Sequence, residues 1–163
     1  MTTPITSAPL ARRELLGILG IGAALGALAG LPAGSAAAAT DAGETQAGRD
    51  NVRIVKDFCA AWSTRDPAKV ADFFADDAGY RVTETAKPTV GLAAIKQLLQ
   101  RFLQRTQQVH FDVQRVFSIG PIVLTERHDH FRGPQGEQVY HVAGVFFVRN
   151  GKIAEWTDYI IRP

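Results

Sequence analysis

IVLTERHDHF, the stretch at residues 122–131, decides the fold of this chain. Its apolar start and the alternation that follows predict one β-strand. Side chains alternate between the two faces of a strand, and residues two apart stand roughly 6.6 Å from one another on the same side. Arg127, Asp129 and Phe131 are therefore predicted to share one face, with the two intervening histidines on the other.

The charged residues of this strand require a partner if they are buried. Arginine and aspartate rarely enter a protein interior without an opposite charge. The best candidate for a second carboxylate is Asp158, in the sequence EWTDY at residues 155–159. An arginine between Asp129 and Asp158 in an apolar cup predicts a general acid/base site. A purely structural ion network is the alternative.

Helical periodicity begins at Asn51. Apolar residues then recur at intervals of three and four, which predicts a helix with one buried stripe. The stripe comprises Val55, Phe58, Cys59 and Trp62. Cys59 is the only cysteine, so it forms no internal disulfide, and we expect an inert buried thiol.

A second helix is predicted to start at Pro67, capped by Asp66, because proline is favoured in the first turn and aspartate at the N-cap. It is expected to end at residues 76–77. A short strand at residues 79–82 and a third helix at residues 92–102 follow.

The second half of the chain is predicted to be β-rich. Apolar or alternating segments occupy residues 109–117, 122–131, 139–148 and 153–161, and turns that contain glycine separate them. Three helices followed by long antiparallel strands indicate an α+β fold, with the helices covering one face of a strongly curved sheet. Bending leaves a cup between helices and sheet, where a pocket is expected.

Residues 1–40 are predicted to be a bacterial export signal. Arg12 and Arg13 precede a weakly apolar run rich in glycine and alanine and then a tract of small residues. The arginine pair resembles the twin-arginine signal, which exports folded proteins. We expect a periplasmic or secreted protein without a stable membrane anchor after cleavage. Residues 41–50 are predicted to be a linker, and residues 51–163 the folded domain.

Composition argues against several classes of partner. The formal net charge is +2, and 46% of residues are apolar. A nearly neutral domain lacks the electrostatic footprint of a nucleic-acid-binding protein. Neither a phosphate-binding loop nor a dinucleotide fingerprint is present. We therefore expect no nucleic-acid partner.

Three histidines raise a metal site as an alternative. His128 and His130 share one strand face, and His141 lies on the next predicted strand. We identify no carboxylate on that face that would complete a ligand set. A sheet surface or a subunit interface is the preferred interpretation.

Several motifs resemble the limonene epoxide hydrolases of the SnoaL-like and nuclear transport factor 2-like superfamily. They are DAGY at 77–80, TERHD at 125–129, GVF at 144–146, GKI at 151–153 and WTDY at 156–159. The resemblance covers the chain from about residue 51 to its end. It implies a cone-shaped fold with a mixed, mostly antiparallel sheet, and a homodimer.

The resemblance also implies catalytic roles for four residues of this sequence. In that family one aspartate protonates the epoxide oxygen, a second acts as general base to a water, and an arginine lies between them. The matching residues are Asp129 as acid, Asp158 as base, Arg127 as bridge and Tyr80 as the residue that holds the water. Two carboxyl groups of opposite protonation state suit this reaction.

One position departs from the family pattern. Val82 stands where the family has an asparagine that helps to hold the nucleophilic water, and Thr83 or Thr85 is a candidate substitute. The predicted substrate pocket comprises Trp156, Phe131, Val82 and Phe146.

The resemblance thus implies a hydrolase that adds water to a small apolar epoxide, with a small apolar organic ligand as its partner and with no cofactor or metal. A non-catalytic small-molecule binding module is an alternative, which Val82 favours. An isomerase or cyclase with an aspartate base is another, although Arg127 is less natural beside a developing enolate.

Overall fold

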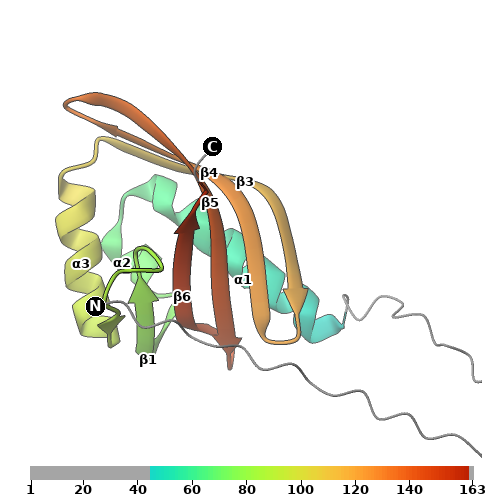
Figure 1. Ribbon diagram of the computed structural model, residues 1–163. Coiled ribbons are helices and arrows are strands. Elements are labelled where there is room, and N and C mark those ends of the chain that lie inside the picture. Colours follow the sequence, from blue (N-terminus) through green and yellow to red (C-terminus); the bar gives the residue numbers. More distant parts are fainter. Residues whose placement is uncertain (1–44, 162–163) are drawn as a thin grey trace, which may run out of the picture. The chain divides into compact units, whose positions relative to one another are not determined.

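The computed structural model describes residues 45–161, so the predicted export signal and residues 41–44 of the predicted linker lie outside the described residues. The described chain has helices on one side of a six-stranded sheet (Figure 1). No helix within this range is both long enough and apolar enough to cross a membrane.

Helix α1, Gln46–Ala61, begins before the predicted start at Asn51. Thr45 caps it, because its side chain accepts a hydrogen bond from the backbone N–H of Gly48 at 3.0 Å. The prediction of a linker up to residue 50 is therefore wrong at its end. Glycine disfavours helix in isolation, which concealed the first turn. One 3-10 turn, η1, follows at Trp62–Thr64.

Helix α2, Pro67–Ala71, has Asp66 as its N-cap, as predicted. The helix is shorter than expected, because strand β1, Phe74–Arg81, starts almost at once. Strand β1 pairs with a strand near the end of the sequence, at residues 152–160. Strand β1 is correspondingly longer than the predicted strand and ends just before Val82. The periodicity of this segment does not reveal that it pairs with a strand so distant in the chain.

Strand β2, Thr89–Val90, pairs antiparallel with β1 and leads into helix α3, Leu92–Gln104. The buried residues of α3 are Ile95, Leu99 and Leu103. Phe102, the last residue of the predicted third helix, is 38% exposed and lines a cavity.

Four long strands complete the sheet. They are β3, Gln108–Ile119, β4, Ile122–Gly133, β5, Gly136–Arg149, and β6, Lys152–Ile160. The order across the sheet is β2-β1-β6-β5-β4-β3. Strands β1 and β6 run parallel, and the other described pairs run antiparallel. The predicted mixed, mostly antiparallel α+β fold is confirmed.

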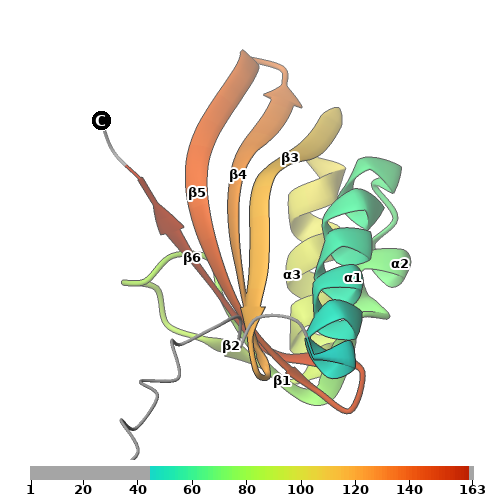
Figure 2. The same cartoon turned by 90° about the vertical axis from the view of Figure 1, so that its right-hand side faces the viewer.

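The sheet is strongly curved, as Figure 2 shows for β3, β4 and β5. Register shifts near Val113 and Phe147 interrupt the pairing, and bulges of this kind bend a sheet. The helices pack against one face through an aromatic core around Phe58, whose ring meets five others at edge-to-face angles. These are Trp62, Phe73, Phe74, Phe146 and Trp156.

Candidate active site

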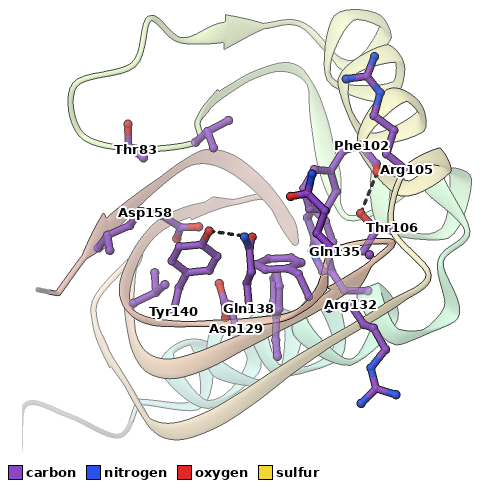
Figure 3. A pocket seen from close by; sticks show the side chains of 18 of the residues that line it. Thr83, Phe102, Arg105, Thr106, Asp129, Arg132, Gln135, Gln138, Tyr140 and Asp158 are labelled. Atoms are coloured by element: carbon purple, nitrogen blue, oxygen red, sulfur yellow. Dashed lines mark hydrogen bonds between the residues drawn. The ribbon is translucent and has the colours of Figure 1, made fainter.

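A cavity of about 520 Å³ opens on the helix side of the sheet (Figure 3). Its apolar wall includes Trp62, Phe111, Phe131, Val142, Trp156 and Ile160. Its polar wall includes Thr83, Thr106, Gln135, Gln138 and Tyr140. Asp129 on β4 and Asp158 on β6 both line it, so two carboxyls distant in sequence face one space.

Arg127 joins these two carboxyls. Its Nε donates to Asp129 Oδ1 at 2.8 Å, and its Nη1 donates to Thr125 Oγ1 at 3.0 Å. Its Nη2 lies 2.6 Å from Asp158 Oδ1. This last contact is an ion pair without the alignment of a hydrogen bond. The arginine side chain has no exposed surface, so the structure brings the three predicted residues together in the interior.

Aromatic rings surround the guanidinium. Its central carbon lies 5.0 Å from the ring centroid of Phe111, 5.9 Å from that of Phe146 and 5.7 Å from that of Trp156. Such contacts stabilise a desolvated cation. Burial lowers the pKa of Arg127, but the charges of Asp158 and Asp129 outweigh burial and keep the pKa above its ordinary value. The arginine therefore remains a cation.

Trp156, a predicted pocket residue, also forms a hydrogen bond with Asp158 and stacks on Tyr80. Its indole Nε1–H donates to Asp158 Oδ1 at 2.6 Å. Its ring stacks on Tyr80, with centroids 4.2 Å apart and planes 11° apart. Burial raises the pKa of Tyr80 well above its ordinary value, so the phenol stays neutral. This stack fixes Tyr80 beside Asp158.

Burial also favours the neutral form of both carboxyls. It raises the pKa of Asp158 to about 6, against the opposing effects of Arg127 and of the Trp156 indole. It raises the pKa of Asp129 as well, again opposed by Arg127. Asp158 Oδ1 faces two donor groups, whereas Asp129 Oδ1 accepts from one. Because these groups interact closely, the two carboxyls titrate as a coupled pair around Arg127.

The other predicted pocket residues divide into two groups. Phe131 and Val82 line the cavity, as does Tyr80, the predicted water-holding residue. Val82 does so from beyond the end of β1 and is 49% exposed, with Thr83 beside it on the wall. Phe146 is fully buried and is not among the lining residues, because it lies beneath the stacked ring of Trp156.

Sequence reasoning missed the polar wall. Tyr140 donates its hydroxyl proton to Gln138 Oε1 at 3.0 Å (Figure 3). Strand pairing places Tyr140 opposite Asp129 and Gln138 opposite Phe131. Strand alternation could have predicted these two residues. Gln138 and Tyr140 lie four and two residues before Val142, so all three side chains point to the same face.

The predicted histidines lie on the opposite face of β4 from Arg127. The rings of His128 and His141 are 4.9 Å apart, and Glu126 Oε1 lies 3.1 Å from His141 Nε2. His130 contacts Glu137 at 3.3 Å. Glu126 stands two residues before His128 and shares this face with it. Within residues 45–161 no three such side chains are arranged to hold a metal ion.

The cysteine of the buried stripe lies in the core. Burial raises the pKa of Cys59 to about 12, even though Arg127 opposes this effect. The thiolate is the nucleophilic form, so burial disfavours reaction at Cys59, which is buried as predicted.

Comparisons with known proteins agree with this geometry. Residues 55–156 match the sequence profile of the SnoaL-like domain. An LEH-like epoxide hydrolase from M. tuberculosis is 28% identical, with a TM-score of 0.64 over 70% of this chain and 84% of that chain. A SnoaL-like protein of Shewanella denitrificans, described provisionally as a polyketide cyclase, is 16% identical, with a TM-score of 0.63 over 68% and 90%. TerC, co-crystallised with polyporic acid, is 15% identical, with a TM-score of 0.60 over 69% and 92%.

The last two likenesses show the fold alone. Together with the profile match, the structural neighbours support a small-molecule-binding or catalytic fold of the nuclear transport factor 2-like type. The superfamily resemblance predicted from the motifs is confirmed.

Proposed function

This chain belongs to the SnoaL-like domain family, and we propose that it adds water to an apolar epoxide in one step by general acid/base catalysis. One observation carries the proposal: Arg127 bridges two buried carboxyls that line the same cavity. The 28% identical LEH-like epoxide hydrolase supports the choice of reaction.

Asp158 acts as the general base in this proposal. Its carboxylate takes a proton from a water, whose oxygen forms a bond to one epoxide carbon. Asp129 gives its proton to the epoxide oxygen as the carbon–oxygen bond of the ring breaks. A diol leaves, and proton exchange through solvent returns the proton from Asp158 to Asp129.

Arg127 distributes charge between the two groups. Two nearby carboxyls resist ionising together, and a shared cation stabilises the state that holds one negative charge. The neutral phenol of Tyr80, whose ring stacks on Trp156, holds the attacking water in this proposal. No covalent intermediate is required.

The cavity walls set the class of substrate. The aromatic wall suits a hydrocarbon ring or chain, because apolar surface is favourably removed from water. Gln138 uses its oxygen to accept from Tyr140, which leaves its amide N–H groups free to donate. We propose an apolar epoxide with one hydrogen-bond acceptor directed toward this wall.

Single-turnover hydration in water enriched in oxygen-18 tests the reaction. With enzyme in excess over a terpene-like epoxide, direct attack by water puts label from the solvent into the first diol formed. An ester intermediate would instead give an unlabelled first diol and a labelled carboxyl on the protein. Label in the diol supports the proposal, and an unlabelled first diol contradicts the one-step mechanism.

The rate of hydration is expected to rise as the pH rises through about 6. Burial raises the pKa of Asp158 to about 6, and a base must lose its own proton before it can accept one from water. This rising limb belongs to the coupled pair of carboxyls and not to Asp158 alone. Measurement of kcat/KM across the acid and neutral range checks this, and a flat profile contradicts the assignment.

A binding module without turnover is the second candidate. Val82, an apolar residue, occupies the lip beside Tyr80, and no hydrogen bond among residues 45–161 holds the Tyr80 hydroxyl. Saturable binding of terpene-like epoxides, observed by calorimetry without formation of diol, would favour this candidate over the hydrolase.

Export and dimerisation are further parts of the proposal. The twin-arginine motif supports export, which retention of an Arg12→Lys/Arg13→Lys precursor in the cytoplasm would test. Apolar residues exposed on the face of the sheet opposite the cavity support a homodimer, among them Phe117, Ile122 and Tyr159. Sedimentation of the purified protein as a monomer would exclude it.

A further inference from the structure

Gly144 lies at the middle of β5, at the point where three strands meet the buried ion network. It pairs with Thr125 on β4 and with Asp158 on β6. Val142 and Phe146, two residues to either side, are buried on the helix side of the sheet. By alternation, a side chain at position 144 would point into the same space.

That space is already occupied. A Cβ atom on Gly144 would lie 2.1 Å from Arg127 Nη1, 2.7 Å from Thr125 Oγ1 and 2.9 Å from Phe146 Cε2. Real Cβ contacts are not this short, so a neighbour would have to move. The backbone of Gly144 does not adopt a left-handed conformation. Space, and not backbone freedom, therefore requires glycine here.

We propose that Gly144 is a positioning residue, whose missing side chain lets the Arg127 guanidinium cross β5 from its own strand to Asp158. Strand order makes this necessary, because β5 separates β4 from β6. A glycine inside a strand weakens it and often marks a close approach of other groups. The close approach here is that of the cation shared by the two carboxyls.

An alanine at this position is expected to act on the two ion pairs unequally. The clash falls on Nη1, at the far end of the guanidinium, whereas Nε, which binds Asp129, lies nearer the side-chain stem. Aromatic rings limit where the guanidinium can go. Asp158 therefore loses most of its contact with Arg127, and Asp129 keeps its own.

Gly144→Ala should consequently raise the pKa of Asp158 by about one pH unit, because a nearby cation favours the ionised carboxylate. Carboxyl-carbon NMR measures this shift without any substrate. The inference on rate depends on the proposed function: the rising limb of kcat/KM should move upward by the same amount, which lowers the value at pH 6 about five-fold. If the wild-type protein is inactive, the kinetic test cannot be made, but the NMR titration of Asp158 still tests the proposal.

Gly79→Ala is the matched control. Gly79 lies on β1 of the same sheet, and a Cβ there meets no atom within 4 Å. This variant should titrate and turn over as the wild type does. A folded Gly144→Ala protein in which Asp158 titrates unchanged would overturn the proposal.

A second variant covers the case in which Gly144→Ala does not fold. Thr125→Ala removes the hydroxyl that lies 2.7 Å from the added Cβ and opens room for Nη1 to shift. Thr125→Ala/Gly144→Ala should fold and show a higher pKa of Asp158 than Thr125→Ala alone. If the double variant is also unfolded, or titrates as Thr125→Ala does, Gly144 serves core packing only and the proposal fails.

Discussion

Asp158→Asn is expected to lower the rate of epoxide hydration by about 10²- to 10⁴-fold, the usual contribution of a general base. The amide has nearly the same shape as the carboxylate, and its oxygen can still accept from the Trp156 indole. It cannot take a proton from water. Asp129→Asn should cause a loss of similar size, because the amide is too weak an acid to protonate the epoxide oxygen.

The measurement is kcat/KM for diol formation, with circular dichroism to show that each variant is folded. Asp77→Asn is a suitable control, because Asp77 is an exposed aspartate that pairs with Arg149 outside the cavity. An exposed pair of this kind contributes little to stability. Undiminished activity in both Asp129→Asn and Asp158→Asn would falsify the hydrolase.

Arg127→Met is expected to reduce the free energy of unfolding by about 3–5 kcal/mol, the typical effect of removing one member of a buried ion network. Methionine fills much of the volume but leaves both carboxyls buried without a cation. Burial already raises their pKa values with Arg127 present, and without it the values should rise further. Epoxide hydration should be lost, because both groups then hold their protons near neutral pH.

The sign of the pH dependence follows from these pKa values. In the folded variant the carboxyls titrate well above their values in the unfolded chain, so the folded state binds more protons. The stability of Arg127→Met should therefore fall as the pH rises from acid toward neutral. Urea unfolding at several pH values measures this trend. Arg149→Met, which removes a half-exposed cation, is the control, and equal effects of the two substitutions would contradict the argument.

The alternation in residues 122–131 was sufficient to predict the faces of β4 and, through the need of a buried arginine for a second carboxylate, the partner Asp158. These inferences use local geometry and the free energy of burying charge, both of which are properties of residue type. The ends of α2 and β1 were predicted wrongly because the parallel pairing of Phe74 with Ile153 decides them. No local pattern reports such a contact.

The sequence also could not predict which side chains reach the cavity and which lie beneath its wall. Phe146 and Trp156 stand directly opposite one another on β5 and β6, yet only Trp156 reaches the cavity. The curvature of the sheet decides between them. The role of Gly144 was hidden for a related reason, because it depends on the path that the Arg127 side chain takes across a neighbouring strand.

The position of β6 has a consequence for synthesis. It is the last strand in the chain, yet it lies between β1 and β5. Asp158 therefore cannot reach Tyr80, which is made some eighty residues earlier, until β6 itself has left the ribosome. A nascent chain that stops before β6 lacks Asp158, the base of the proposed acid/base pair. If the proposed twin-arginine export occurs, the translocase, which admits only folded cargo, would select chains in which this insertion of β6 is complete.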